Sequence, residues 1–358
     1  MKKFLLICSF LWVVTPSFSQ SDSLDIKIGQ MIMIGMNGSA VTDQSPIINA
    51  IQKRYVGGVL LFEFNLNPFQ TETKLAALTN KLQDAASIPL IIAIDQEGGK
   101  VNRLKTKYGF KEMPSAKTIG LKNDDEYTTE IGNTIADALQ RCGINMNFAP
   151  VLDVDNPNCP VLGKLQRCYD ADVSKITHMA SLIMEAHAAK GIKTVVKHFP
   201  GHGNSRTDSH KGLADVSNYW TQKELLPYKN LLASNHINAI MTGHLINKKL
   251  DPSGLPATLS KKIINDLLRT EMGYQGVVIS DDMQMHAISK YYGLKESIRL
   301  GILAGVDIFI FSNNIENATQ YTPANIHASI KKMVLNHEIS LERIDESYQR
   351  IMSMKMSR

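Results

Sequence analysis

Cysteine is scarce in this chain, which has only four cysteines among its 358 residues. Cys8 lies in an N-terminal segment that we expect to be removed, which leaves Cys142, Cys159 and Cys168. An odd number of widely spaced cysteines fits neither a disulfide scaffold nor a cysteine zinc site. Cys142 ends a helical pattern and is expected to be packed. Cys159 and Cys168 share a loop, where they either pair in an oxidising compartment or remain free thiols.

The sequence also lacks a large excess of charge and any block of like charges. Its formal net charge is +5, and without Lys2 and Lys3 it has 37 basic against 34 acidic residues, a net charge of +3. Such a small excess does not indicate nucleic acid as the main partner. Hydrophobic residues make up 44% of the chain and charged residues 20%, so a largely disordered protein is excluded.

Long hydrophobic runs are missing beyond the first twenty residues. There, two lysines precede an apolar run over residues 4–14, and Pro16 and small polar residues follow it. The run is too short for a stable membrane anchor, and its flanks are typical of a secretory signal peptide. We therefore predict that residues 1–20 are a signal peptide and that residues 21–358 form an exported, periplasmic protein without stable membrane insertion.

Short runs rich in β-branched and other apolar residues recur along the rest of the chain. There are eight of them, at residues 28–36, 56–62, 88–95, 143–150, 192–199, 238–245, 276–282 and 306–312. Between most of them, apolar residues recur at three- and four-residue spacing, most clearly at residues 73–86, 125–141 and 173–190. Strands that are apolar on both faces and alternate with helices favour a parallel sheet. Eight such units predict an α/β protein with a closed (β/α)₈ barrel, and a doubly wound open sheet is the alternative.

The remaining patterns predict helices on the outside of one domain. Ser260 has the chemistry of a helix cap and precedes an apolar helical pattern. Residues 323–354 read as a helical tail, with Ser340 opening the last helix. No low-complexity linker divides the chain, so we expect a single domain, and we expect it to be a monomer.

Ionisable residues follow several of the predicted strands directly. Asp95, Lys197, His198 and Asp281 all stand at or near such strand ends, beside glycine or other polar residues. The carboxyl ends of barrel strands converge on one face. Residues far apart in the sequence are therefore expected to share one pocket there.

The richest of these segments is residues 197–210, KHFPGHGNSRTDSH. Its glycine, asparagine and serine residues indicate a mobile loop. Asp208 and His210 are two residues apart, so the carboxylate can orient the imidazole and raise its basicity. That suits a proton donor that later acts as a base. The alternative is a solvated loop whose histidines have no function, but the density of such residues favours chemistry.

Two further motifs bring carboxylates to strand ends. In GVVISDDM (residues 276–283), Asp281 can attack an electrophilic carbon, with Asp282 as a supporting acid. A helix N-cap is an equally ordinary use of either aspartate. In IDQEGGKVNR (residues 94–103), Asp95 and Arg103 suit the recognition of sugar hydroxyls, although a turn with a solvated ion pair has the same pattern.

Taken together, the strings DQEGGKVNRL, KHFPGHGNSRTDSH and GVVISDDM resemble the β-N-acetylglucosaminidase branch of glycoside hydrolase family 3. The resemblance extends over about residues 26–313 and includes the order of the motifs. It implies a single-domain (β/α)₈ barrel that acts on a GlcNAc-containing glycan, with no cofactor and no metal.

The resemblance also implies a role for individual residues. Asp281 matches the nucleophile, His210 the general acid/base and Asp208 its partner. Substrate contacts are implied for five residues: Asp95, Arg103, Arg167, Lys197 and His198. The chain departs from the family where Cys168 follows Arg167, since the family usually has serine there.

The implied activity is retaining, two-step hydrolysis that releases terminal β-linked GlcNAc. Peptidoglycan fragments are the expected substrate, and chitin oligosaccharides are the alternative one. On the same fold, a GlcNAc phosphorylase, a β-glucosidase or a β-xylosidase are the rival activities. From another class, His198 and His202 are four residues apart and could belong to a metal-dependent hydrolase.

Overall fold

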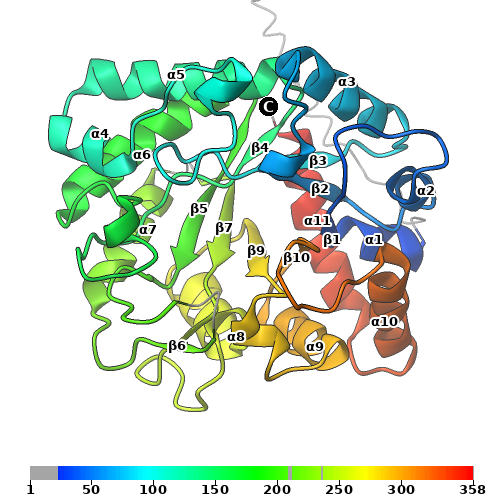
Figure 1. Cartoon of the computed structure of the whole chain (residues 1–358). Coiled ribbons are helices and arrows are strands. Elements are labelled where there is room, and N and C mark those ends of the chain that lie inside the picture. Colours follow the sequence, from blue (N-terminus) through cyan, green and yellow to red (C-terminus); the bar gives the residue numbers. More distant parts are fainter. Residues whose placement is uncertain (1–22, 209–211, 235–236, 358) are drawn as a thin grey trace, which may run out of the picture.

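A closed barrel of eight parallel strands forms the centre of the molecule, and helices surround it (Figure 1). This computed structural model describes residues 23–208, 212–234 and 237–357. Neighbouring strands follow the order β1-β10-β9-β7-β5-β4-β3-β2, and every pair is parallel. The predicted (β/α)₈ barrel is confirmed, and the open doubly wound sheet is excluded because β1 pairs with β10.

Each of the eight predicted runs contains one barrel strand. The barrel strands are β1 (Ile32–Gly35), β2 (Gly58–Leu61), β3 (Ile91–Ile94), β4 (Met146–Asn147), β5 (Lys193–Phe199), β7 (Ala239–Thr242), β9 (Val277–Asp282) and β10 (Ile308–Phe311). Two short strands, β6 (Ala214–Asp215) and β8 (Leu245–Ile246), pair with each other outside the barrel sheet.

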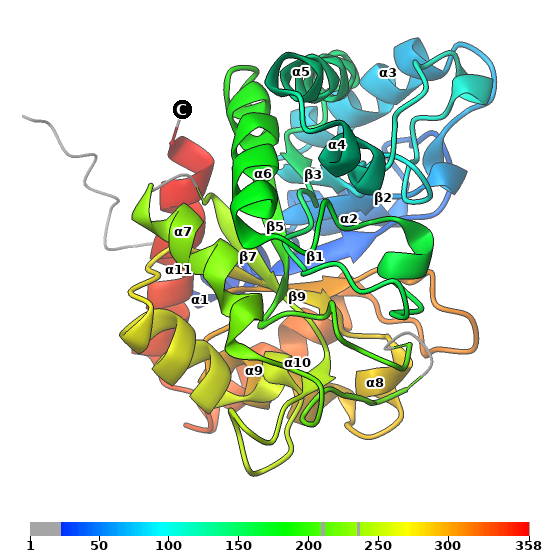
Figure 2. The same ribbon diagram turned by 90° about the vertical axis from the view of Figure 1, so that its left-hand side faces the viewer.

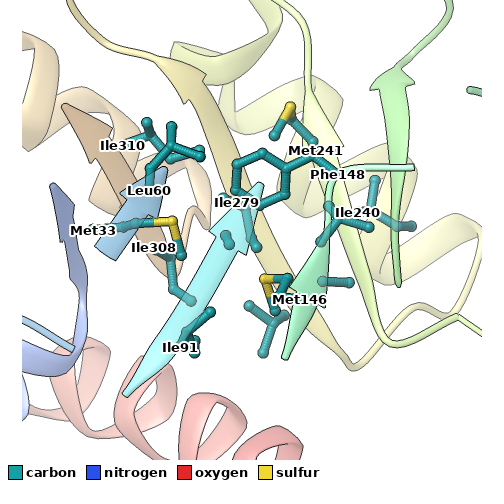
Figure 3. Packing of buried hydrophobic residues seen from close by; sticks show 14 of the residues in the cluster. Met33, Leu60, Ile91, Met146, Phe148, Ile240, Met241, Ile279, Ile308 and Ile310 are labelled. Atoms are coloured by element: carbon teal, nitrogen blue, oxygen red, sulfur yellow. The ribbon is translucent and has the colours of Figure 1, made fainter. Parts of the chain in front are cut away.

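The strands are apolar on both faces because both faces are covered. All four residues of β3 and of β10 are buried, in the sequences IIAI and IFIF. Inside the barrel, side chains from different strands pack together, among them Met33, Leu60 and Ile279 (Figure 3). The barrel is thus filled by its own side chains, which leaves the strand ends as the place for a site.

Helices form the outer layer (Figure 2). They are α1 (Leu24–Gln30), α2 (Pro46–Gln52), α3 (Thr71–Asp84), α4 (Ala116–Lys122), α5 (Asp125–Arg141), α6 (Val173–Ala188), α7 (Leu226–Ala233), α8 (His286–Ser289), α9 (Leu294–Ala304), α10 (Pro323–Leu335) and α11 (Leu341–Met356). A π-helix, η6 (Lys262–Glu271), precedes β9, and short 3₁₀ turns are η1 (Glu63–Asn65), η2 (Thr106–Tyr108), η3 (Gly163–Leu165), η4 (Gln222–Leu225) and η5 (Ala257–Leu259). None of the helices in the described part combines the length and the apolar composition needed to cross a membrane.

Side-chain caps fix several helix starts where the sequence predicts them. Ser340 accepts a hydrogen bond from the backbone N–H of Arg343 at the start of α11. Ser260 accepts one from the N–H of Ile263 ahead of η6. Asp172 accepts N–H donors at the start of α6. These caps satisfy backbone donors that have no partner within the helix.

The first apolar run does not coincide with its strand. The apolar run at residues 28–36 begins inside α1, whose last residues from Ile28 to Gln30 are buried, and the strand starts only at Ile32. A short buried run suits a helix as well as a strand, so periodicity alone does not separate the two.

The three cysteines among the described residues are buried free thiols. Cys142 follows the last residue of α5, as predicted. Cys159 and Cys168 lie in one small apolar cluster with Val151 and Leu162, and they remain unpaired with each other.

Candidate active site

A cavity of about 490 Å³ lies at the carboxyl ends of the barrel strands. Its volume is within the range of about 300–1,000 Å³ typical of small-molecule sites. Seven of the eight predicted site residues line it: Asp95, Arg103, Arg167, Lys197, His198, Asp208 and Asp281. The eighth, His210, lies outside the described residues.

Lys197, near the end of β5, is the centre of a buried charge network. Its side chain is only 2% exposed, and Nζ lies 2.7 Å from Asp95 Oδ1 and 2.7 Å from Glu97 Oε1. Burial lowers the pKa of Lys197, but the charges of Asp95 and Glu97 outweigh burial and raise that pKa above its usual value. Arg103 Nη2 lies 3.5 Å from the second oxygen of Asp95. The network therefore holds a protonated amine and a carboxylate side by side on the cavity wall.

Glu97 ties Lys197 to Arg167. The Nε and Nη2 atoms of Arg167 each donate to one oxygen of Glu97 at 2.8 Å, a bidentate pair. Burial raises the pKa of the Glu97 carboxyl, but the charges of Arg167 and Lys197 outweigh it and hold that pKa well below its usual range. Arg167 Nη1 also donates to the carbonyl oxygen of Val161 at 3.0 Å. The guanidinium is thus fixed before any substrate binds.

Asp153 orients His198. Its carboxylate is fully buried and lies 2.7 Å from Nδ1 of His198, and it also accepts the backbone N–H of His202 at 2.7 Å. Burial raises the pKa of Asp153, but the neighbouring His198 outweighs burial, so that this pKa lies below its usual value. Burial, together with the charge of His198, lowers the pKa of His202 to about 4. The other ring nitrogen of His198, Nε2, lies 3.5 Å from Arg167 Nη2, and both residues line the cavity.

Asp281 and Asp282 end β9 with different surroundings. Asp281 is partly exposed on the cavity wall, and its Oδ1 accepts the backbone N–H of Asp282 at 2.8 Å. Asp282 also borders the cavity, but its oxygens accept the backbone N–H groups of Gln284 and Ser312 and the Ser312 hydroxyl. Burial raises the pKa of Asp282 to about 6. Of the two acids, Asp281 is the more exposed, and Asp282 joins β9 to the segment after β10.

The loop after β5 brings Asp208 to the same cavity. At its start, Gly201 has a φ of +116°, and a Cβ at this position would lie 2.4 Å from the Glu224 Cβ, so glycine is required there. Glu224 accepts hydrogen bonds from the backbone N–H of Asn204 at 3.1 Å and from its Nδ2 at 2.8 Å. The first half of the loop is therefore anchored, and the chain reaches the cavity wall at Asp208, just before residues 209–211.

The contacts of His198 do not suit the role of metal ligand that the metal-dependent alternative gives it. His198 Nδ1 is occupied by Asp153, and its Nε2 faces the Arg167 guanidinium, a cation. Among the residues with a described position, no group of three or more His, Cys, Asp or Glu side chains is arranged to hold a metal ion. Zinc sites need at least three such ligands.

Sequence reasoning did not identify Glu97 and Asp153 as site residues. Both are buried carboxylates that hold the predicted residues in place rather than line the cavity. A signal for Glu97 was present, because it stands two residues after Asp95 in the same motif, a spacing that places side chains on one side of an extended chain. Asp153 follows β4 and carries no comparable motif.

Curated relatives with a shared name resemble this chain. β-Hexosaminidase A of Pseudoalteromonas piscicida is 33% identical over 340 residues, which are 88% of this chain and 56% of that protein. β-Hexosaminidase of Nitrosomonas eutropha is 31% identical over 298 residues, 81% of this chain and 82% of that protein. The chain thus spans about half the length of the first relative and most of the second.

Solved structures of similarly named enzymes also resemble this chain. A glycoside hydrolase family 3 β-N-acetylglucosaminidase from Paenibacillus sp. superposes with a TM-score of 0.85 at 35% identity and covers 94% of this chain, which corresponds to 62% of that one. A β-N-acetylhexosaminidase from Beutenbergia cavernae gives a TM-score of 0.84 at 25% identity, with 95% of this chain and 100% of that chain covered.

The family profile agrees in extent with the barrel and its helices. The profile described as the glycosyl hydrolase family 3 N-terminal domain matches residues 23–354, which is nearly all of the part that the structure describes. The chain therefore belongs to glycosyl hydrolase family 3.

Proposed function

We propose that this protein is an exo-acting β-N-acetylhexosaminidase that releases terminal β-linked GlcNAc with retention of configuration. The observation that carries the proposal is the meeting of Asp281, Asp208 and the Lys197 network in one cavity. The names of the relatives support the choice of sugar. A carboxylate nucleophile, a proton donor on a loop and a polar wall are the parts that a retaining glycosidase needs.

The reaction has two steps. In the first, the Asp281 carboxylate attacks C1, the bond between C1 and the leaving oxygen breaks, and protonated His210 gives its proton to that oxygen. In the second, neutral His210 takes a proton from water, the water oxygen attacks C1, and the bond to Asp281 breaks. Asp208 orients the imidazole. An imidazole replaces one member of the usual carboxylate pair, so the spacing rule for two carboxylates does not apply here.

The buried network would bind and orient the aminosugar. Protonated Lys197 and Arg103 can donate to hydroxyl or acetyl oxygens, and Asp95 can accept from hydroxyl groups. The Nε of Arg103 is buried and has no hydrogen-bond partner in the described structure, which makes it a suitable donor to a sugar oxygen. Because the wall is fixed in advance by Glu97, little reorganisation is needed when the sugar binds.

We further propose peptidoglycan fragments as the natural substrate and the periplasm as the location. The charged and apolar pattern of residues 1–20 supports export, and it lies outside the described residues. Chitin oligosaccharides contain the same terminal sugar, so product analysis on disaccharide-peptides and on chitobiose decides between the two.

Hydrolysis of aryl β-GlcNAc and aryl β-glucoside by the wild-type protein tests the activity. We expect the GlcNAc substrate to be cleaved far faster, with the β-anomer as first product by NMR. Added phosphate and added chelator should leave the rate unchanged. A faster rate on the glucoside would point to a β-glucosidase, a rate that depends on phosphate to a phosphorylase, and loss of the rate with chelator to a metal-dependent hydrolase.

A further inference from the structure

An exposed aromatic side chain borders the mouth of the cavity. Phe64 is 44% exposed and lines the cavity, whereas most large apolar side chains of the described part are buried. Pockets that bind small molecules are lined largely by apolar and aromatic side chains, so Phe64 is placed to contact a ligand of this cavity. Phe64 belongs to the short η1 turn that follows β2, so it stands at the same barrel end as the predicted catalytic residues.

The turn that carries Phe64 is rigid. The buried side chain of Asn65 donates to the carbonyl oxygens of Met36 and Gly38 at 2.8 Å each, and its Oδ1 accepts the N–H of Phe62 at 2.8 Å. The Phe64 ring also stacks on Phe62, with centroids 5.4 Å apart and planes 14° from parallel. The exposed ring is therefore held in place before a ligand arrives, which lowers the entropic cost of binding.

Glu63, the acidic neighbour of Phe64, already has two lysines as partners. Glu63 accepts hydrogen bonds from Lys105 at 2.5 Å and lies 2.7 Å from the Nζ of Lys107. These two ammonium groups lower the pKa of Glu63 to about 2. Because Glu63 is bound to its own lysines, the contribution of this turn to ligand binding comes from the ring of Phe64.

Other apolar side chains border the same cavity. Among them are Pro160, Leu165 and Ile315, and of these Leu165 is 36% exposed. The charged groups lie deeper, since the side chain of Lys197 is 2% exposed and that of Asp95 is 19% exposed. These charged groups thus lie in the interior of the cavity, and the exposed side chains of Phe64 and Leu165 lie nearer its rim.

We propose that Phe64 is the binding platform for the sugar on the leaving-group side of the bond that is cut. This inference rests on the proposed function. In an exo-acting enzyme, the terminal sugar fills the charged interior and the leaving group lies toward the mouth, where Phe64 stands. One face of a pyranose ring carries mainly C–H groups, which pack on an aromatic face with the hydroxyls left in water. The platform therefore selects a pyranose leaving group over one without a ring.

Two substrates with the same terminal sugar distinguish a contact of Phe64 with the leaving group from an effect of Phe64 on the terminal sugar or on the fold. Chitobiose has a pyranose leaving group, whereas GlcNAc β-fluoride has a leaving group of one atom. We expect Phe64→Ala to shift the ratio of the two kcat/KM values by roughly tenfold against chitobiose, the scale of a lost aromatic contact. Phe64→Trp, which keeps an aromatic face, should keep the wild-type ratio. Phe69→Ala is the matched control, because Phe69 is 75% exposed and does not line the cavity.

The Phe64 platform and the proposed function would be contradicted by different results. If wild-type protein cleaves both substrates and Phe64→Ala leaves their ratio as it was, the platform is wrong and the proposed function stands. An equal loss on both substrates would also contradict the platform, since it would mean that Phe64 acts on the terminal sugar or on the fold. If the wild-type protein cleaves neither substrate, the proposed function itself is wrong, and the inference falls with it.

Discussion

Glu97 is the residue on which the geometry of the cavity depends most. It is the shared partner of two buried cations, Arg167 and Lys197, which lie on separate segments of the chain. With this carboxylate neutralised, Lys197 would keep Asp95 as an ion-pair partner, and Arg167 would lose its bidentate partner. Removing one member of a buried ionic group is costly, because the remaining charges stay desolvated.

The substitution Glu97→Gln tests the role of this carboxylate in both stability and substrate binding. We expect the free energy of unfolding to fall by about 2–4 kcal/mol and KM to rise, since Arg167 and Lys197 lose their fixed positions. Glu72→Gln is the control, because the Glu72–Arg141 pair is also a Glu–Arg contact but its side chains are 44% and 53% exposed. That change should cost no more than about 1 kcal/mol. Urea unfolding measures both, and equal losses in the two variants would contradict the role given to Glu97.

The same residues show what the sequence could and could not predict at this scale. Asp95, Lys197 and Asp281 could be identified because each follows or ends a predictable strand, and strand ends of a barrel meet. The pairs that hold them could not, since Glu97 and Arg167 are 70 positions apart and His198 and Asp153 are 45 apart. No local pattern specifies which buried carboxylate will meet which cation.

At the scale of elements, hydrogen bonds to η4 anchor the loop after β5. Glu224, in η4, is fully buried and accepts hydrogen bonds from Asn204 and, at 3.3 Å, from the backbone N–H of Val154. Burial raises the pKa of this carboxyl to about 8, and the negative charge of Asp153 adds to the shift. Tyr228 is buried close to both acids. The loop that carries Asp208 is thus anchored on an acid that titrates near neutral pH.

This anchor predicts a pH dependence of stability. Between the ordinary pKa of 4.5 and the raised value of about 8, the folded protein keeps the Glu224 proton and the unfolded chain has lost it. The contribution of Glu224 to stability therefore decreases as pH rises through this window, by at most about 1.4 kcal/mol per pH unit. Glu224→Gln cannot titrate, so its unfolding free energy should fall less steeply with pH than that of the wild type. An unchanged slope would contradict the raised pKa.

Glu271→Gln serves as the control for that experiment. Glu271 is a surface residue whose side chain is 66% exposed, and its contact with Lys229 is long, at 4.0 Å. Its replacement should leave the wild-type slope intact. Taking the difference between variant and wild type removes the contributions of other buried groups, such as Asp282, whose raised pKa of about 6 lies in the same range.

Helices with one apolar face and strands with two apolar faces could be predicted from the sequence. The helix α5 begins at Asp125 and ends at Arg141, as its spacing predicts, because its periodicity is strong and Asp124 caps it. The start of β1 could not be predicted, since the last residues of α1, just before the strand, are buried as well. The short strands β6 and β8 have only two residues each and no pattern that could reveal them.

On the scale of the whole molecule, opposite ends of the barrel have different tasks. At the amino ends of the strands, Lys355 of α11 donates to Gln30 Oε1, the carbonyl oxygen of Gly57 and that of Pro89, at distances of 2.6–2.9 Å. This end joins the last helix, drawn in red in Figure 1, to three segments that precede β1, β2 and β3. The carboxyl ends are thereby left for chemistry, the division that barrels of this type share.

The closure of the barrel follows from counting units rather than from any single motif. Ile32 of β1 pairs with Phe309 of β10, which lies near the other end of the chain. Eight recurring apolar runs predicted this closure, but the register between the first and last strands depends on packing of the complete barrel.

The central claim is that Asp281 becomes covalently bonded to the sugar, and one measurement tests it most directly. The protein is incubated with a fluorinated β-GlcNAc substrate that slows the second step, and the mass of the intact protein and of its peptides is then determined. We predict a single added sugar on the peptide that contains Asp281, and no adduct in Asp281→Asn. An adduct on Asp282 or on another carboxylate, or turnover that yields the inverted anomer with no adduct, would contradict this account.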